Sequence, residues 1–115
     1  MSAAVEAKYR SSDVFVIDVD TEAATAVVFS SDAPAKFRVI DVLVIALATA
    51  GSGTVKITDG TSDITDAIVA ATDKAVTRAG TIDDAKNEIS AGGSLSVVVA
   101  NAADARVIIT CVWTD

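Results

Sequence analysis

The sequence contains no histidine, one cysteine, one proline and few aromatic residues, and each shortage excludes a kind of chemistry or fold. Without histidine the chain lacks the most common general acid–base and metal ligand, and every Ser-His-Asp or Cys-His catalytic arrangement is excluded. The single cysteine, Cys111, cannot form an internal disulfide or a zinc site. Because it lies within the apolar segment 108–113, we expect a small buried hydrophobic side chain rather than a reactive thiol.

Leucine is also scarce, and the apolar residues that are present are small or β-branched. The 115 residues include 17 Val, 10 Ile, 12 Thr and 22 Ala but only 3 Leu, and 51% of the chain is hydrophobic. Val, Ile and Thr suit the pleated, half-buried surface of a β-sheet. This composition excludes a Leu-rich helical bundle and a disordered chain, and the length provides for one hydrophobic core.

Basic residues are too few to balance the acidic ones. Nine Lys and Arg oppose 16 Asp and Glu, which gives a net charge of −7. A negative field repels phosphate groups, so we expect no nucleic-acid partner. The longest apolar run, residues 42–48, has 7 residues, whereas about 20 are needed to span a bilayer. We therefore expect no membrane partner, and we expect synthesis in a cytoplasm without export by an N-terminal signal.

Residues 1–12 are small, polar and weakly patterned. They carry a net charge of +1, whereas residues 13–115 carry −8. We expect an extended N-terminal arm over 1–12, with a frayed terminus as the alternative. The remainder, 13–115, is expected to form a single β-sandwich domain.

Short apolar segments predict strands at 14–19, 24–29, 36–48, 54–59, 94–100 and 106–114. Turn residues separate them, at 30–34, 51–53, 59–60, 92–93 and 101–104. The Asp59-Gly60 pair and the 101–104 segment each predict a hairpin loop. Short strands at regular spacing favour an antiparallel sandwich or barrel.

The segment 36–48 is apolar on both faces. Strict alternation divides it into one face with Val39, Asp41, Leu43, Ile45 and Leu47, and another with Ile40, Val42, Val44 and Ala46. Such a strand is central in a two-layer fold or packs against a neighbouring subunit. Asp41 then needs either an ionic partner, for which Arg38 is a candidate, or an exposed position at an edge or subunit boundary.

Residues 62–90 carry conflicting signals. Ser62 as a cap, Gly80 as a terminator and an apolar stripe at helical spacing slightly favour a helix by local rules. The flanking strands and several Thr and Val residues favour β structure. The aspartates of this region, Asp59, Asp63, Asp66, Asp83 and Asp84, are interpreted as solvated turn and capping residues. A calcium site is the weaker alternative, because the ligand order of an EF-hand loop is missing.

The sequence also lacks the patterns of several enzyme classes. Gly51-Ser52-Gly53 is not followed by the Lys and Ser or Thr of a phosphate-binding loop. No motif places two carboxylates for glycosidase chemistry. We therefore predict that the protein is not an enzyme and that it holds no cofactor and no metal ion.

Two segments resemble the small head decoration (cement) proteins of tailed bacteriophages. They are Thr54–Ile68 (TVKITDGTSDITDAI) and Arg78–Val97 (RAGTIDDAKNEISAGGSLSV). The likeness extends over residues 40–114 and lies in turn spacing and general character rather than in a catalytic signature. Residues 1–35 do not contribute to it.

The resemblance implies a jelly-roll β-sandwich that assembles as a homotrimer on the outer surface of the capsid. It implies that residues 62–90 are mostly strand and loop. The partner would be the major capsid protein, the location the outer surface of the virion, and the role structural, namely stabilisation of the head. Within the N-terminal arm, Lys8, Tyr9 and Arg10 are the candidate capsid-contact residues, because Tyr and Arg are favoured at interfaces.

Other functions remain open at this point. One alternative is a carbohydrate-binding or fibre-type jelly-roll module of a phage particle, although sugar sites usually need exposed aromatic platforms and this chain has few aromatic residues. Another is a shell or filament subunit unrelated to phage. An enzyme is the least supported class.

Overall fold

The computed structural model describes residues 14–114, which form nine β-strands joined by loops and contain no helix. The strands are β1 (Val14–Asp20), β2 (Ala26–Phe29), β3 (Phe37–Ala46), β4 (Thr54–Thr58), β5 (Ile68–Val69), β6 (Val76–Arg78), β7 (Glu88–Ile89), β8 (Leu95–Ala100) and β9 (Ala105–Trp113). The all-β class predicted from the sequence is confirmed, and the six predicted strands correspond to the six longest. The predicted N-terminal arm, 1–12, lies outside the described residues.

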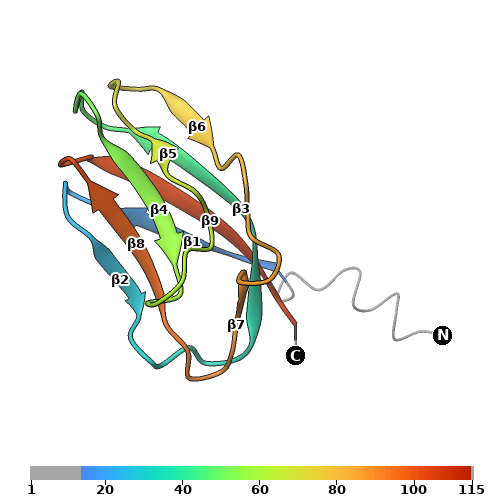
Figure 1. Cartoon of the computed structure of the whole chain (residues 1–115). Coiled ribbons are helices and arrows are strands. Elements are labelled where there is room, and N and C mark those ends of the chain that lie inside the picture. Colours follow the sequence, from blue (N-terminus) through green and yellow to red (C-terminus); the bar gives the residue numbers. More distant parts are fainter. Residues whose placement is uncertain (1–13, 115) are drawn as a thin grey trace.

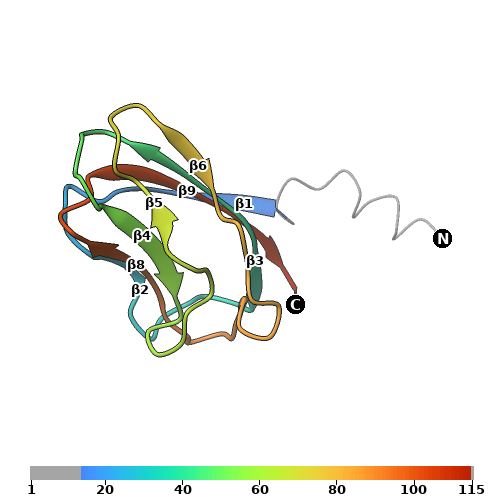
Figure 2. The same cartoon turned by 45° about the horizontal axis from the view of Figure 1, so that its top comes forward.

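The strands form two antiparallel sheets that face each other (Figure 1). The first sheet has the order β1-β9-β3-β6, with β7 paired to β3, and the second has the order β2-β8-β4-β5. Figure 2 shows these two layers from a different angle. Consecutive strands cross between the sheets except at β4–β5 and β6–β7, which is the winding of a jelly roll. The predicted jelly-roll-like β-sandwich is therefore confirmed.

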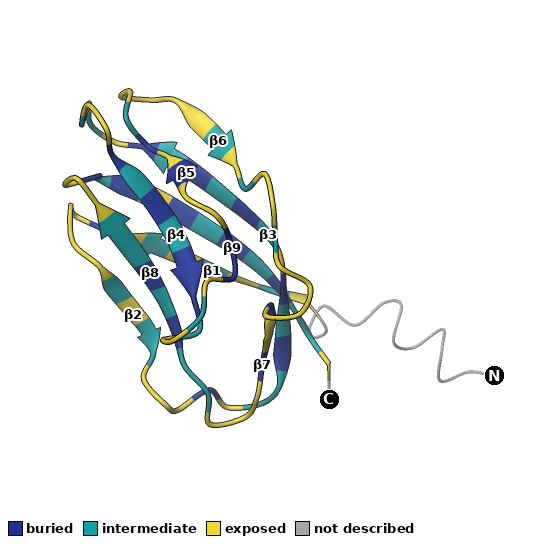
Figure 3. Cartoon of the chain, viewed as in Figure 1, coloured by how far each residue is buried: buried dark blue, intermediate teal, exposed yellow. Residues whose placement is uncertain are grey.

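The hydrophobic core lies between the sheets and consists largely of branched aliphatic side chains. Figure 3 marks the buried residues in dark blue along the strands of both sheets. Its fully buried members include Val42, Val44, Val107 and Ile109 from the first sheet and Val55, Ile57, Leu95 and Val97 from the second. Removing such a side chain from water contributes about 1.5–3 kcal/mol. The core thus explains why the chain is rich in Val and Ile.

Simple alternation predicts the inward face of the regular strands correctly. Val55 and Ile57 of β4 are fully buried, whereas Lys56 between them is only half-buried. The 101–104 segment is a four-residue loop, but the hairpin prediction is wrong there, because β8 and β9 belong to different sheets. After β4 the chain does turn back on itself, with Gly60 at φ 93° and an antiparallel pairing of β4 with β5.

A β-bulge in β3 overturns the face assignment made from strict alternation. Pairing with β9 shifts register between Val39 and Asp41, so one extra residue is accommodated there. Val39 is fully buried in the core rather than sharing a face with Asp41, and Ile40 is 47% exposed rather than lying beside Val42. Asn87 holds the distortion: its Nδ2 donates to the Val39 carbonyl at 2.9 Å, and the Val39 N–H donates to the Asn87 carbonyl at 2.9 Å.

Residues 62–90 are strand and loop, so the local preference for a helix is wrong. The segment runs beside β4, where the Ile64 N–H donates to the Ile57 carbonyl at 2.8 Å and the Ala70 N–H to the Gly53 carbonyl at 2.9 Å. These pairings satisfy backbone groups that a helix would have satisfied internally. Burial of Ile64 and Ile68 in the core then favours the extended form.

Residues 14–114 contain no helix long and apolar enough to cross a membrane.

Candidate interaction surface

The outer face of the first sheet carries most of the exposed, large hydrophobic side chains of the described residues. On β1, β9, β3 and β6 the side chains that alternate with the core residues point away from the second sheet. The apolar ones are Val14, Val16, Ile40, Leu43, Ile45, Val76, Ile108 and Val112. Four of these are about half exposed, at 49% for Val14, 58% for Val16, 47% for Ile40 and 60% for Val76. We call this surface, together with its charged residues, the outer face.

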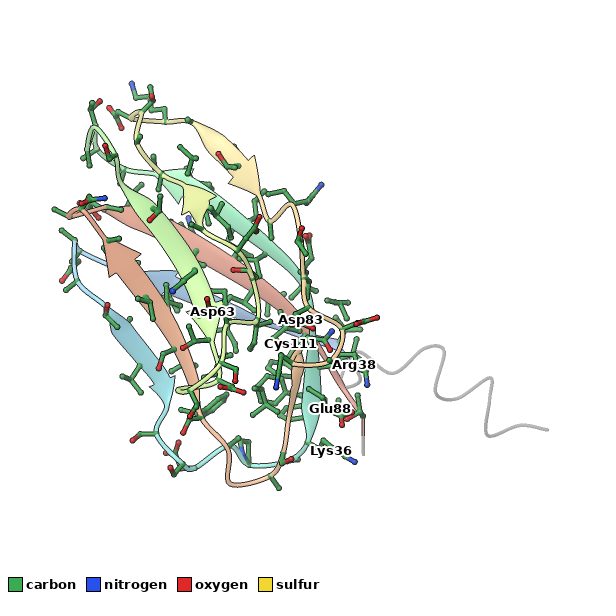
Figure 4. All side chains as sticks on the ribbon, in the orientation of Figure 1. Lys36, Arg38, Asp63, Asp83, Glu88 and Cys111 are labelled. Carbon is green, nitrogen blue, oxygen red and sulfur yellow. The ribbon has the colours of Figure 1, made fainter. Side chains whose placement is uncertain are left out.

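Three ion pairs cross between strands of the outer face. Arg106 on β9 donates through Nε to both carboxylate oxygens of Asp18 on β1, at 3.0 and 3.1 Å. The other two pairs are Arg78 Nε with Asp41 Oδ1 and Arg38 with Glu88 Oε2, each at 3.1 Å. Arg38 and Glu88 lie together beside β7 in Figure 4. The pairs connect β9 with β1, β6 with β3, and β3 with β7.

Strand register arranges these charges around an apolar centre. Leu43 on β3 lies opposite Ile108 on β9, and the same row continues to Asp18 on β1 and Arg78 on β6. The hydrogen bonds from Arg106 hold the pKa of the Asp18 carboxyl below its usual value. The pKa of the Arg106 guanidinium rises for the same reason. Leu43 and Ile108 therefore form an apolar pair at the centre of this row, with a charged residue on the edge strand at each end.

The partner predicted for Asp41 is wrong, and Asp41 lies partly exposed on the central strand β3 rather than at a sheet edge. Its position at a subunit boundary, the other alternative, stays a prediction. Asp41 lies on the outer face, and its ionic partner is Arg78 rather than Arg38. Arg78 comes close because β6 pairs with β3, a contact between distant segments of the chain. Local sequence could not reveal this pairing, since β6 lies in the region that carried conflicting helix and strand signals.

The outer face of the second sheet is more polar. Its central strands present Thr54 and Lys56 from β4, and Ser96, Val98 and Ala100 from β8. Two valines of the edge strands are exposed there: Val27 on β2 at 61% and Val69 on β5 at 57%. The two faces of the sandwich thus differ in chemistry, although both have exposed valines at their edges.

The aromatic residues of the described chain pack against one another. Phe15 stacks on Trp113 with ring centroids 4.2 Å apart, and both rings contact Phe37 edge-on. The ring centroids of Phe29 and Phe37 are 5.7 Å apart. Phe37 is fully buried, and the other three pack against the core. The candidate contact residues Lys8, Tyr9 and Arg10 lie outside the described residues.

Cys111 lies on the inward face of β9 and is fully buried, as predicted. Burial raises the pKa of its thiol to about 12. A thiol in this environment stays protonated at neutral pH and is a poor nucleophile. The prediction of a small buried hydrophobic side chain is confirmed.

The aspartates after β4 act in turns and ion pairs. Asp59 Oδ1 accepts hydrogen bonds from the backbone N–H groups of Ser62, at 2.6 Å, and Thr61, at 2.9 Å, and these bonds lower the pKa of Asp59. Asp63 lies 3.3 Å from Lys56 Nζ. Residues 14–114 contain no cluster of three His, Cys, Asp or Glu side chains that could hold a metal ion.

An open hollow of about 230 Å³ lies between the Asp59 turn and the β7–β8 connection. Asp59, Glu88 and Ser94 are among its lining residues. The Ser94 hydroxyl accepts a hydrogen bond from the Ser31 N–H at 2.9 Å, which holds the neighbouring loop. Glu88 is paired with Arg38 on the outer face. Asp59, Glu88 and Ser94 therefore each have a partner within the protein.

Comparison with known proteins gives no family for this chain. No family model matches it, and no curated protein matches its sequence. Among solved structures, a similar chain comes from work described as "Bacillus endospore appendages form a novel family of disulfide-linked pili". That similarity has a TM-score of 0.33 and 13% sequence identity over 90% of this chain and 87% of the other. A similarity at this level establishes neither a shared family nor a shared function.

Proposed function

We propose that this protein is a structural virion protein, a decoration or cement protein that binds the outer surface of a tailed-phage head as a homotrimer and stabilises it. The observation that carries the proposal of a self-associating structural protein is the outer face of the first sheet, which leaves eight branched apolar side chains at least partly open to solvent. Apolar surface of this extent, flanked by polar groups, is characteristic of a protein–protein contact.

The resemblance to cement proteins supports the proposal from the sequence. Its two segments, Thr54–Ile68 and Arg78–Val97, include β4, the residues 59–68 that follow it, and the chain from the end of β6 into β8. The jelly-roll sandwich is the fold that the resemblance implies. The acidic body agrees with a position outside the capsid, away from packaged DNA.

Stabilisation would follow from preferential binding. A protein that binds the assembled mature shell, and not its dissociated subunits, lowers the free energy of the shell by mass action. A trimer presents three equivalent contacts, so contacts that are weak alone gain strength through effective concentration. No catalytic step is needed for this role.

The aromatic cluster argues against the carbohydrate-binding alternative. The four aromatic side chains of residues 14–114 pack against one another and the core, so none of them forms an exposed platform for a sugar ring.

A sedimentation experiment tests the proposed function. The purified protein is mixed with mature heads, immature shells and dissociated capsid protein of the phage whose genome encodes it. We expect it to sediment with mature heads and to raise the temperature at which they break open. Failure to bind any of these particles would overturn the proposal. Deletion of residues 1–12 should leave a folded trimer that no longer coats heads, and undiminished coating would refute the role of the arm.

A further inference from the structure

We infer that the outer face of the first sheet is covered by a second copy of this chain, rather than by the capsid. This inference rests on the proposed function in one respect, namely that a trimer requires a contact between copies. It adds the location of that contact and leaves attachment to the shell to other parts of the chain. Composition, charge and the existing ion pairs of the face support it independently.

The basic residues of the outer face are all arginines. All three described arginines, Arg38, Arg78 and Arg106, lie on the outer face, whereas none of the four described lysines lies on a strand of this sheet. Protein–protein interfaces are enriched in Arg and depleted in Lys. The eight apolar side chains lie among these arginines. The face thus has the composition of an interface rather than of a solvated sheet surface.

The distribution of charge indicates which partner fits. On the outer face the three arginines oppose four carboxylates, Asp18, Asp20, Asp41 and Glu88, so its net charge is −1. The rest of residues 14–114 has four lysines against nine carboxylates, a net charge of −5. Two copies of an acidic protein repel each other over most of their surfaces, and the near-neutral outer face is where this repulsion is weakest.

The ion pairs reduce the cost of covering the face. Asp18, Asp41 and Glu88 each have an arginine of their own subunit as partner before any contact forms. Covering them therefore leaves none of these three carboxylates buried without a counter-charge, the condition under which burial is most destabilising. The fourth carboxylate, Asp20 at the end of β1, is not part of these pairs and has to stay in water. At the centre of the face a second copy needs to supply only apolar surface.

The size of the face sets the expected strength of association. Four strands spaced about 4.8 Å apart, with an average of about seven residues of 3.3 Å each, cover roughly 440 Å² in projection. A standard interface buries about 800 Å² on each partner. This projection omits the side chains that project from the pleat, so the true contact area is larger. It still lies toward the small end of standard interfaces. We expect oligomerisation to depend on protein concentration.

Two pairs of matched valines make the test specific. Val16 and Val76 lie on the edge strands of the first sheet and are 58% and 60% exposed, whereas Val27 and Val69 lie on the edge strands of the second and are 61% and 57% exposed. The outer-face variant carries Val16→Lys and Val76→Lys. The control variant carries Val27→Lys and Val69→Lys, and thus has the same change in charge at equally exposed edge positions.

Sedimentation equilibrium at about 1 to 100 μM, a range that covers weak to moderate association, measures the mass of each protein. We expect the full chain and the control variant to associate alike, and the outer-face variant to show a dissociation constant at least about tenfold higher. Circular dichroism and thermal unfolding establish that both variants fold.

The outcomes separate this inference from the proposed function. A wild-type protein that is monomeric throughout, or an outer-face variant that associates as strongly as the control, overturns the inference. Loss of head binding in the outer-face variant with its oligomeric state unchanged also overturns it, because the face would then contact the shell. If the wild type associates through this face but binds no phage head, the inference stands and the proposed function fails.

Discussion

Replacement of Thr21 by Val is expected to destabilise the sandwich because it removes a hydroxyl that ties β1 to β9. Thr21 follows the last residue of β1 and is 4% exposed. Its Oγ1 donates to the Ala103 carbonyl and accepts from the Ala105 N–H, both at 3.0 Å. Ala103 and Ala105 are themselves fully buried. Val has nearly the shape of Thr, so the substitution removes the two hydrogen bonds and leaves the packing almost unchanged.

The size of the effect follows from the two groups that lose their partner. A buried donor or acceptor without a hydrogen bond costs about 1–3 kcal/mol. Because the loop after Thr21 can relax in part, we expect Thr21→Val to lower the free energy of unfolding by about 2–4 kcal/mol in total. Thr21→Ser keeps the hydroxyl and loses one methyl group, which costs about 1 kcal/mol.

Urea unfolding, followed through the fluorescence of the single tryptophan, measures both variants. Trp113 is a suitable probe because it stacks on Phe15, so unfolding changes its surroundings. All proteins are compared at one concentration, since self-association raises apparent stability. If Thr21→Val is no less stable than Thr21→Ser, the two hydrogen bonds do not hold the end of β1, and the reasoning is wrong.

Three further predictions concern backbone packing, acid stability and thiol reactivity. Gly53→Ala should destabilise the fold by about 1–3 kcal/mol in urea unfolding, because the new Cβ would lie 2.9 Å from the Ala70 carbonyl oxygen. Gly51→Ala, whose Cβ would meet nothing within 4 Å, is the control and should be nearly neutral. Hydrogen bonds from the Arg106 guanidinium lower the pKa of the Asp18 carboxyl. The stability that this ion pair contributes is therefore complete above the unfolded-state pKa of about 3.9, and it is lost as the pH falls through the lower folded-state pKa. Asp18→Asn should therefore lose less stability than the wild type in an acid titration below about pH 4, and equal losses would contradict this assignment. Cys111, with its pKa raised to about 12 by burial, should resist a thiol-labelling reagent in the native protein and react after unfolding.

The regular strands could be predicted because one of their faces is apolar and the other is not. In β4 a register slip by one residue would move Val55 and Ile57 from the core to solvent, so alternation determines the face. The same logic failed in β3, where both faces are apolar. The extra residue at the bulge reverses the phase before Asp41, and no change in residue type marks it. Only pairing with β9 and the contact with Asn87 reveal it.

The segment between β4 and β8, residues 59–94, shows the limit of local rules more clearly. Its apolar residues recur at helical spacing, and Ser62 and Gly80 are suitable helix-terminal residues. Its conformation is determined by pairing along the edge of β4 opposite β8, where the Ile57 and Gly53 carbonyls accept hydrogen bonds from the Ile64 and Ala70 N–H groups. Local rules, which consider neighbouring residues alone, do not include this pairing. The segment also supplies Val76 and Arg78 to the outer face, so that face could not be predicted in full without the fold.

The two apolar faces of β3 gave two interpretations, a central strand or a strand against a neighbouring subunit. The structure confirms the first, and the second stays a prediction that the outer face supports. β3 is central in the first sheet, and the core accounts for Val42 and Val44 on its inner face. The core does not account for Leu43 and Ile45, which point away from it and contribute nothing to the sandwich interior. Ile108 on β9, opposite Leu43, and Val76 on β6, opposite Ile45, extend this apolar surface to the neighbouring strands. A monomer would gain solubility from polar residues at these positions at no cost to its core, so the apolar outer face is better explained by a contact between subunits than by the folding of one chain.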